Sequence, residues 1–250
     1  LIDSARLRDE KIDAYHVGFV LGPRLNACGR MGHARAAVAL LTHAQQPQAN
    51  EQALFLQQRN EERRTLEKAL FEEARQMVYD TGGDHPDQRA IVLGKEGWHQ
   101  GVVGIVASRL VEEFHRPAIL LSIEGDLAHG SARSVPGVAL HEALHACAAH
   151  LTRFGGHAMA AGMHLETRHI PAFRAALIEY VNPIFPVEHL VGTQRVDAWC
   201  DIADVQMNVF EHLQKLAPFG QSNPAPVLAL QQVKLVRPPW RMGGRGQHLR

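Results

Sequence analysis

The feature that most constrains the fold is a long run, Ala49 to Asp80, that contains neither glycine nor proline. The run is rich in Glu, Gln, Arg and Leu, and Leu66, Leu70, Ala74 and Met77 recur in it at helical spacing. The pattern predicts one long helix. A helix of this length divides the chain into the part that precedes it and the part that follows it.

A cluster of helix breakers, TGGDHPD at residues 81–87, ends the long run and marks the best domain boundary in the chain. Upstream, residues 1–48 hold the glycine-rich segment GPRLNACGRMG and then ARAAVALLTHA, which predicts a short apolar helix ending near Pro47. We therefore assign residues 1–80 to one part of the chain and expect a separate domain after the breakers.

Strand-like and helix-like segments alternate within residues 81–182. Strands are predicted at residues 89–93, 118–123 and about 127–134, and helices at residues 102–114, 138–151 and 170–181. A glycine-rich stretch, FGGHAMAAGMHL, is predicted to form a tight loop that runs into a further strand. Strands that alternate with helices of about ten to fifteen residues indicate an α/β domain with a partly parallel sheet.

The pattern changes at Pro183. Residues 183–250 predict a strand near residues 195–200, a helix at 205–216, a turn at PFGQSNPAP and a strand at 227–236, which could begin a small β-barrel. The chain opens on Leu1 instead of methionine and closes on GGRGQHLR soon after a strand-like run. Both ends are typical of cuts, so we expect a fragment in which this last module is truncated.

Composition limits the class of protein. With 46% hydrophobic and 21% charged residues among 250, the chain can bury a core in one large domain or two smaller ones. No apolar run reaches the length of a membrane span, and the N-terminus lacks the apolar core of a signal peptide, so we expect a cytoplasmic protein with no membrane partner. The odd number of cysteines, Cys28, Cys147 and Cys200, suits a reducing compartment. Lys plus Arg equals Asp plus Glu at 26 each, so any anion site must be local.

Two short segments carry arginines in settings that suit anion binding. In GPRLNACGR, a Gly-Pro pair predicts a rigid turn from which Arg24 and Arg30 point outward, with Asn26 as an added donor and acceptor. In HGSARSVPG, Ser131 and Arg133 are two residues apart, so on a strand they share one face and could grip a phosphate. The alternatives, a structural turn and a polar edge strand, fit the same residues.

Glycines also mark two places where a ligand could approach the backbone. FGGHAMAAG places His157 directly after Gly155 and Gly156, and such a loop can bring main-chain N–H groups and an imidazole to a phosphate or a base. The alternative is a tight turn between packed elements. EGWHQGVVGIVASRL reads as a loop entering a helix, where Trp98 could stack on a base, although an aromatic packed at the start of the helix is the commoner outcome.

Residues 141–145, HEALH, fit the HExxH zinc pattern, in which two histidines one helical turn apart bind the ion. Histidine makes up 16 of 250 residues, so chance pairs at this spacing are expected, and no third ligand follows. The apolar stripe of the predicted helix leaves His141 and His145 at its margin. We therefore expect surface residues here and not a zinc peptidase site.

Taken in order, GPRLNACGR, GWHQGVVGIVASRL, FHRPAIL, GSARS and FGGHAMAAG resemble the RecJ-type single-strand-specific DNA exonucleases of the DHH phosphoesterase superfamily. The resemblance is close over residues 15–182 and looser over residues 183–250, where PFGQSNPAPVL is similar to the passage into an OB domain. It implies the end of a DHH domain and a connecting helix over residues 1–80, a DHH-associated α/β substrate-binding domain over residues 81–182, and an OB-like nucleic-acid-binding module over residues 183–250.

The resemblance implies a 5′-to-3′ exonuclease that degrades single-stranded DNA with Mn²⁺ or Mg²⁺ in recombination and repair, with single-strand-binding protein as a possible partner. The metal ligands of such enzymes lie in an upstream DHH domain, and no Asp-His-His signature occurs in this sequence. We therefore expect no metal ligand in this chain and no activity of the chain by itself.

The resemblance also implies roles for individual residues. Ser131 and Arg133 would hold the terminal 5′-phosphate, Arg24 would contact DNA at the same end, and His157 would sit beside the phosphate under attack. These are binding and electrostatic roles, because in two-metal hydrolysis the ions generate the nucleophile and stabilise the leaving oxygen. The implied catalytic residue is His157, and the implied substrate-binding residues are Arg24, Asn26, Arg30, Ser131, Arg133, Gly155 and Gly156.

Two other functions fit the same sequence. One is a DHH-type phosphodiesterase that acts on short oligonucleotides or cyclic dinucleotides. The other is a non-catalytic nucleic-acid-binding module. The long helix and the extra module after Pro183 favour the RecJ-type function, because a long strand of DNA needs a second region of contact.

Overall fold

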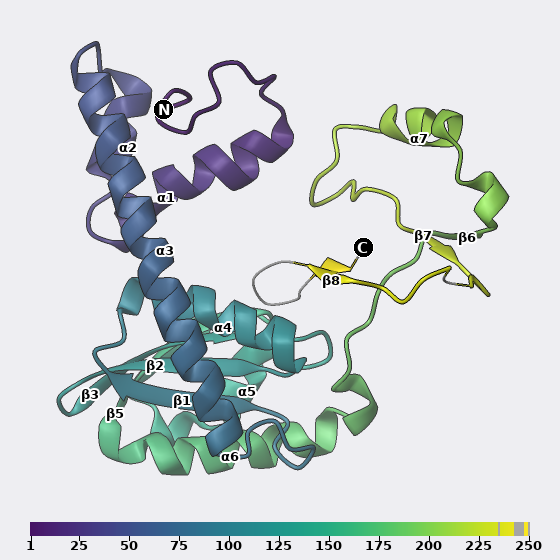
Figure 1. Cartoon of the computed structure of the whole chain (residues 1–250). Coiled ribbons are helices and arrows are strands. Elements are labelled where there is room, and N and C mark those ends of the chain that lie inside the picture. The colour runs from purple at the N-terminus through teal and green to yellow at the C-terminus, as the bar shows by residue number, and fades with distance from the viewer. Residues whose placement is uncertain (235, 243–247, 250) are drawn as a thin grey trace. The chain divides into compact units, whose positions relative to one another are not determined.

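The computed structural model describes residues 1–234, 236–242 and 248–249 of the chain. The chain divides into two compact units. The first comprises Leu1–Ile12 and His16–Gly192, and the second comprises Asp13–Tyr15 and Thr193–Arg250. Figure 1 shows the first unit, in which α3 runs from the small helices α1 and α2 at one end to a β-sheet at the other.

Helices make up the upstream part of the first unit. A π-helical segment, His16–Leu21, leads into α1 (Gly22–Arg30), which is followed by α2 (Arg35–Thr42) and α3 (Gln48–Asp80). The predicted long helix is confirmed. Among the described residues, no helix combines the length and the apolar character that a bilayer crossing requires.

The predicted turn at GPRLNACGR is wrong, because this segment is the helix α1. Its proline lies at the start of α1, directly after the π-helical segment His16–Leu21, and the fixed φ of proline suits the helix. The Gly-Pro pair therefore lies where the π-helical segment passes into α1. Cys28 of α1, Ala37 of α2 and Leu56 of α3 form the small core that joins the three helices.

A five-stranded sheet with the order β1-β2-β3-β5-β4 forms the centre of the first unit. β1 and β2 are parallel and are connected by α4, whereas the β2–β3, β3–β5 and β4–β5 pairs are antiparallel, so the predicted partly parallel sheet is confirmed. The elements are β1 (Ile91–Glu96), α4 (Gln100–Phe114), β2 (Ala118–Glu124), β3 (Leu127–Arg133), α5 (Leu140–Ala146), β4 (Arg153–Gly156), β5 (Ala160–Glu166) and α6 (Ile170–Ile184).

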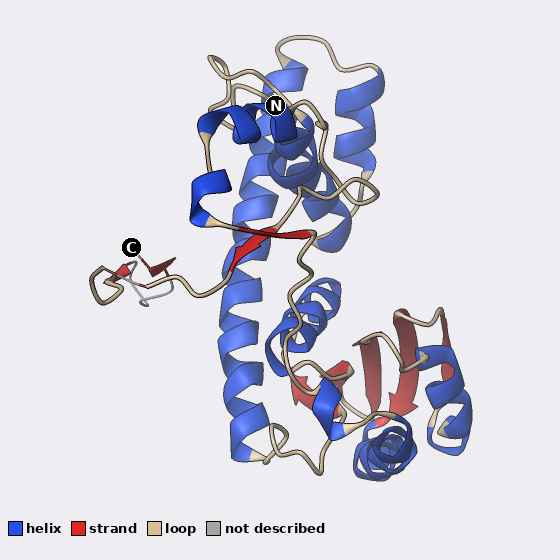
Figure 2. Ribbon diagram, turned by 90° about the vertical axis from the view of Figure 1, so that its right-hand side faces the viewer, coloured by secondary structure: helices blue, strands red, loops and turns tan. Residues whose placement is uncertain are grey.

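Helices cover both faces of this sheet, as Figure 2 shows. Alternate residues of β2 enter two separate cores, because successive side chains of a strand point to opposite faces. Leu120 packs with residues of α3 and α4, and Leu121 packs with residues of α5 and α6. The long helix thus belongs to the core of the α/β domain through its C-terminal half, which includes Leu70 and Phe71.

Three details of the α/β domain differ from the prediction. The glycines of FGGHAMAAGMHL lie on β4 and β5 and not in a loop, and only residues 157–159 form the hairpin turn to β5. The helix predicted at residues 138–151 is shorter, since α5 ends at Ala146 and a 3-10 turn, Ala148–His150, follows. α6 continues past the predicted end at Val181 and contains Pro183 within its last turn.

The second unit is built from short elements. They are β6 (Ala198–Cys200), α7 (Met207–Gln214), β7 (Leu228–Leu230), β8 (Arg241–Met242) and β9 (His248–Leu249), with β6 parallel to β7. The strand predicted at residues 227–236 is shorter than expected, and residue 235 lies outside the described residues, as do residues 243–247 and 250 of the terminal GGRGQHLR. None of its described residues up to Trp240 is buried, so this unit has no core of its own in the described part of the chain.

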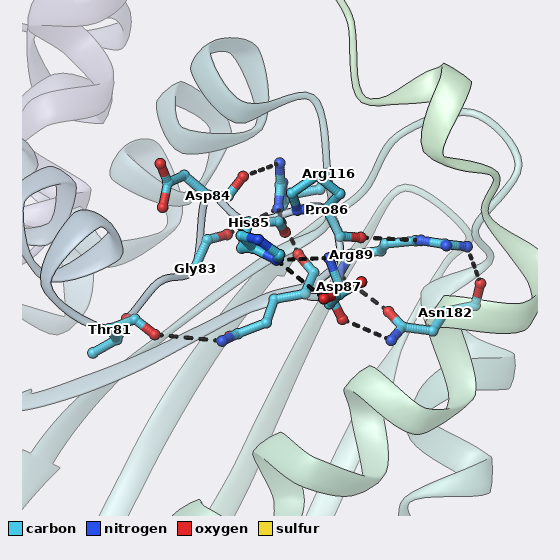
Figure 3. A network of polar contacts seen from close by, with 10 residues as sticks. Thr81, Gly83, Asp84, His85, Pro86, Asp87, Arg89, Arg116 and Asn182 are labelled. Carbon is cyan, nitrogen blue, oxygen red and sulfur yellow. Dashed lines mark hydrogen bonds and ion pairs between the residues drawn. The ribbon is translucent and has the colours of Figure 1, made fainter.

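A buried guanidinium holds the junction between α3 and β1, as Figure 3 shows. Arg116 lies two residues before β2 and is only 4% exposed. It donates hydrogen bonds of 2.5–3.1 Å to a group of backbone carbonyls, most of them in the segment between α3 and β1. The acceptors are the carbonyls of Gly83, Asp84, His85, Gln88 and Phe114.

A second arginine joins the same junction to the end of α6. Arg89 Nη1 donates to the carbonyls of Asn182 and Phe185, the latter at 2.9 Å. The Asn182 side chain also accepts a hydrogen bond from the Arg89 backbone N–H at 3.1 Å and donates one to the Asp87 carbonyl at 2.8 Å. The residues between α3 and β1 are therefore fixed to both β2 and α6.

We predict that Arg116→Met lowers the free energy of unfolding by about 2–5 kcal/mol, because several backbone carbonyls lose a charged donor while the site keeps its apolar volume. Urea unfolding followed by circular dichroism measures the change. The control is Arg168→Met, since Arg168 is 72% exposed and pairs with Glu166 at the surface, and its loss should cost under about 1 kcal/mol. Equal losses in the two variants would contradict the structural role of Arg116.

Candidate nucleic-acid interface

Ser131 and Arg133 lie side by side on one face of β3, as their spacing predicts. Arg133 Nη1 donates to Ser131 Oγ at 3.1 Å and to the Ala132 carbonyl at 2.8 Å. Ala132, between them, is fully buried in the core on the opposite face. The hydroxyl and the guanidinium therefore form one polar group that is held by a rigid strand, which is the arrangement that a phosphate grip requires.

α4 approaches this pair closely because residue 104 is glycine. A Cβ at Gly104 would lie 2.7 Å from Ser131 Oγ and 3.2 Å from Arg133 Nη2. Glycine inside a helix costs about 1 kcal/mol relative to alanine, so its presence indicates a packing or functional reason. The reason here is the space that Ser131 and Arg133 occupy beneath the helix.

Arg30 reaches the same region from the end of α1. Its Nη1 donates to the Gly101 carbonyl at 3.3 Å, and a Cβ at Gly101 would overlap the Arg30 carbonyl oxygen at 2.1 Å. The C-terminal end of α1 therefore lies against the first turn of α4. Burial lowers the pKa of Arg133, and the positive charge of Arg30 lowers it further. Two guanidinium groups that repel each other in this way favour an anion between them.

A glycine surface extends from this pair across β5 and β4. Ser131, Gly162 and Gly155 are direct cross-strand neighbours in the register. Gly155 and Gly162 are exposed, and a Cβ at Gly155 would meet nothing within 4 Å. The sheet backbone beside Ser131 is therefore open to an extended ligand.

Gly156 and His157 form the start of the hairpin between β4 and β5. Gly156 has a φ of 153°, and a Cβ there would lie 2.5 Å from the Ala160 carbonyl, so the turn itself requires this glycine. The His157 backbone N–H donates to the Ala160 carbonyl at 2.8 Å, and its side chain is exposed. Since Ala160 pairs with Arg133, the turn lies at the end of β3 that carries Arg133.

Arg24 is not part of this cluster. Its Nε donates to Gln57 Oε1 at 2.6 Å and its Nη1 donates to the Val20 carbonyl at 2.5 Å, so it links α1 to α3. Burial lowers the pKa of Arg24, with a further contribution from Arg64. Asn26 lies on the exposed side of α1. The structure thus brings Arg30, and not Arg24, to the pair on β3.

Trp98 is packed in the core and does not present its ring to a base. The side chain is 6% exposed, and its Nε1–H donates to Glu73 Oε2 at 2.7 Å. Hydrogen bonds from Lys95 and then from Trp98 lower the pKa of Glu73. Next to it, His99 Nδ1 accepts from the Gly101 N–H at 3.1 Å and caps α4. The packing alternative is therefore the one that this residue adopts.

The histidines of HEALH are exposed on α5 and do not converge on one point. His141 Nε2 lies 3.7 Å from Glu142 Oε1, whereas the His145 ring meets Phe154 edge-on with centroids 5.0 Å apart. Within the described part of the chain, no group of three or more His, Cys, Asp or Glu side chains is arranged to hold a metal ion.

Sequence reasoning missed the role of the helical glycines. Gly101 and Gly104 both decide how closely α4 approaches other elements. The signal was present in GVVG, because Gly104 lies inside the helix predicted at residues 102–114, where glycine is unfavourable unless close packing requires it, and Gly101 lies directly before that helix. The sequence did not show which residues pack against these glycines, because Arg30, Ser131 and Arg133 are distant from them in sequence.

Comparison with known proteins identifies two domains in the chain. A DHHA1 domain model matches residues 87–182, and a RecJ OB domain model matches residues 196–250. Both matches fall where the structure has, respectively, the five-stranded sheet with its helices and the second unit. Residues 87–182 are therefore similar to DHHA1 domains, and residues 196–250 are similar to the OB domain of RecJ proteins.

The similar proteins are single-stranded-DNA-specific exonucleases named RecJ. The chain is 42% identical to that of Bacillus subtilis over 88% of this chain and 28% of the relative. Two crystal structures of RecJ from Thermus thermophilus match this chain at 32% identity. The complex with Mn²⁺ has a TM-score of 0.81, and the match covers 98% of this chain and 35% of that one. The complex with Mg²⁺ has a TM-score of 0.78, and the match covers 89% of this chain and 34% of that one. The chain therefore spans about a third of the length of the relatives that it matches.

We predict that Gly104→Ala leaves the fold intact but weakens anion binding several-fold. The new methyl group must displace Ser131 Oγ, which lies 2.7 Å from its position, while alanine gains about 1 kcal/mol of helix propensity. Fluorescence anisotropy with a 5′-phosphorylated oligothymidylate measures binding, and thermal melting measures the fold. Gly18→Ala is the matched control, because a Cβ at Gly18 meets nothing within 4 Å. Unchanged binding in Gly104→Ala would exclude the pair beneath α4 as the anion site.

Proposed function

We propose that this chain, which is homologous to RecJ proteins and contains a DHHA1 domain and a RecJ OB domain, supplies the DNA-end and phosphate-binding surface of a 5′-to-3′ single-stranded-DNA-specific exonuclease. The intact protein hydrolyses phosphodiester bonds in DNA recombination and repair. The observation that carries the proposal is the pair of Ser131 and Arg133 on β3, with Arg30 beside it.

The chemistry of this pair suits a terminal 5′-phosphate. A guanidinium offers a rigid fork of donors, and a serine hydroxyl adds one more donor, so together they match the oxygens of a phosphate group. The positive charge of Arg30 raises the local potential in a chain whose total charge is zero. Asn26 is exposed on α1, and the exposed glycine surface of β4 and β5, including Gly155, lets an extended strand contact the sheet backbone.

His157 contributes to the reacting end of the DNA in this proposal. Its exposed imidazole, set in a turn that Gly156 makes possible, lies at the Arg133 end of β3. An imidazole there can donate a hydrogen bond to a phosphate oxygen and stabilise charge as it develops. Arg24 stabilises α1 against α3, and through α1 it positions Arg30.

The catalytic metal ions, Mn²⁺ or Mg²⁺, are held outside this chain in our proposal. RecJ structures contain these ions, and two-metal hydrolysis needs a cluster of carboxylates. The metals supply the attacking hydroxide and stabilise the leaving oxygen when they are bound. The residues of this chain bind and orient the DNA, and single-strand-binding protein is a proposed partner that presents it.

The alternatives differ in substrate. A phosphodiesterase for short oligonucleotides or cyclic dinucleotides would use the same pair on β3 but would have little use for an OB domain. That domain, which matches at residues 196–250, favours a longer strand as the ligand. By itself, this chain would act as a non-catalytic nucleic-acid-binding module.

We predict that Arg133→Ala removes most of the preference for 5′-phosphate over 5′-hydroxyl ends, while Arg133→Lys keeps the charge but loses the two-point contact. A hydrogen bond to a charged group contributes about 1.5–3 kcal/mol, so the preference should fall by roughly ten- to a hundredfold. Binding and cleavage of paired 5′-phosphate and 5′-hydroxyl oligonucleotides by the intact protein measure it.

The salt dependence of binding is the control for Arg133. Its slope on a logarithmic scale, about −0.7 for each phosphate neutralised on a single strand, should change little, because only one or two contacts are lost. If Arg133→Ala keeps the full end preference, Ser131 and Arg133 are not the pocket for the 5′ end.

We also predict that this chain alone binds single-stranded DNA but does not hydrolyse it, even with Mn²⁺, since it lacks the carboxylate cluster of a two-metal site within its described residues. Gel analysis of a labelled oligonucleotide after prolonged incubation checks hydrolysis. Mn²⁺-dependent cleavage activity that copurifies with the chain through every purification step would contradict this prediction.

A further inference from the structure

Two histidines face each other on the same side of the sheet as Ser131 and Arg133. His129 lies on β3, two residues before Ser131, and His164 is its direct cross-strand partner on β5. Both side chains are half-buried, so they are held by the sheet but remain accessible to solvent. Thr152 holds the β5 side of the pair, because its backbone N–H and its hydroxyl both donate to the His164 carbonyl at 2.9 Å.

The two imidazoles meet through the same atom. His129 Nδ1 and His164 Nδ1 lie 3.0 Å apart, and the rings are T-shaped with centroids separated by 4.6 Å. A straight N–H···N hydrogen bond between these atoms would place the ring centres on the order of 5.3 Å apart, because the donor, the hydrogen and the acceptor would lie in line with both centres. The two nitrogens are within hydrogen-bond distance, but the shorter separation of the ring centres means that the line between the nitrogens is inclined to the centre-to-nitrogen direction of at least one ring.

The two separations also fit a metal ion bound beside both nitrogens. An imidazole nitrogen binds a transition metal at about 2.0–2.1 Å, so two nitrogens 3.0 Å apart subtend an angle of about 90–95° at the ion. Rings that point at such an ion would have centres roughly 4.7 Å apart, which is close to the 4.6 Å observed. A tetrahedral ion would instead separate the nitrogens by about 3.3–3.4 Å.

We propose that His129 and His164 form a two-imidazole site for a divalent transition metal ion that accepts neighbouring ligands at right angles, such as Ni²⁺ or Cu²⁺. Imidazole nitrogen and tetragonal geometry are the preferences of these ions. With two protein ligands, water or an oxygen of another molecule completes the coordination. The site differs from a closed structural zinc site, which would need more protein ligands than the described residues offer here.

The metal site is separate from the proposed catalytic function. It lies two residues along β3 from Ser131, a distance of about 7 Å at the usual rise of a strand. A bound ion would add positive charge to the face of the sheet that already carries Arg133. Metal binding itself does not depend on DNA, so it can be tested with the chain alone.

The test is isothermal titration of the apo chain with Ni²⁺, followed by electron paramagnetic resonance with one equivalent of Cu²⁺. We expect one Ni²⁺ per chain, and a Cu²⁺ spectrum typical of nitrogen coordination in a tetragonal field. His129→Gln and His164→Gln should each weaken Ni²⁺ binding by about tenfold or more, because the loss of one imidazole removes the chelate. Circular dichroism verifies that both variants are folded.

The matched control is the double variant His141→Gln/His145→Gln, which removes the two histidines that lie one helical turn apart on α5. It should keep the full affinity and the same Cu²⁺ spectrum. Stoichiometric binding that survives in His129→Gln and His164→Gln but is lost in the control variant would place the metal on α5 and overturn the proposal. The absence of any stoichiometric Ni²⁺ or Cu²⁺ binding by the wild-type chain would overturn it as well.

Discussion

The arrangement of the first unit depends on the satisfaction of backbone carbonyls by the buried Arg116 guanidinium. Residues 83–88 turn sharply between the long helix and the first strand, and a turn of this kind leaves carbonyl groups that neither a helix nor a sheet can pair. Arg116 carries several donors in one plane and meets them from its position two residues before β2. Burial lowers its pKa, but a guanidinium stays charged in any case, so the interaction persists at all ordinary pH values.

This junction has consequences for the site on β3. Since α3 is fixed to the sheet at its C-terminal end, it packs against α4 through Leu70 and Phe71, and Arg109 of α4 lies 3.7 Å above the Phe71 ring. At its other end α3 carries α1 through Arg24 and the small core around Leu56. The C-terminal end of α1 therefore reaches the first turn of α4, and the long helix acts as the support that brings Arg30 to the face of the sheet.

The site itself is an example of charge gathered locally in a chain without net charge. The numbers of acidic and basic residues are equal, but Arg133, Ser131 and His129 lie on one face of β3, and His164 lies beside them on β5. Glycines make this face accessible in two ways. Gly104 lets a helix approach Ser131 and Arg133, and the glycines of β4 and β5 leave the neighbouring backbone uncovered. Burial and like charge then make the Arg133 guanidinium favour an anion.

Most secondary structure followed from the sequence, because periodicity and helix breakers are local properties. The long helix, the partly parallel sheet and the shared face of Ser131 and Arg133 were predicted from spacing alone. The turn predicted at GPRLNACGR was wrong, because a Gly-Pro pair can also lie within a helical segment, and only the packing of α1 on α3 decides between the two. The sequence by itself thus determined most types of element and the chemical groups that they carry. The tertiary structure alone decided that the charge of Arg30 acts on Arg133 and that His129 pairs with His164 across the strands. The proximity of distant segments is fixed by sheet register and helix packing, and not by local propensity.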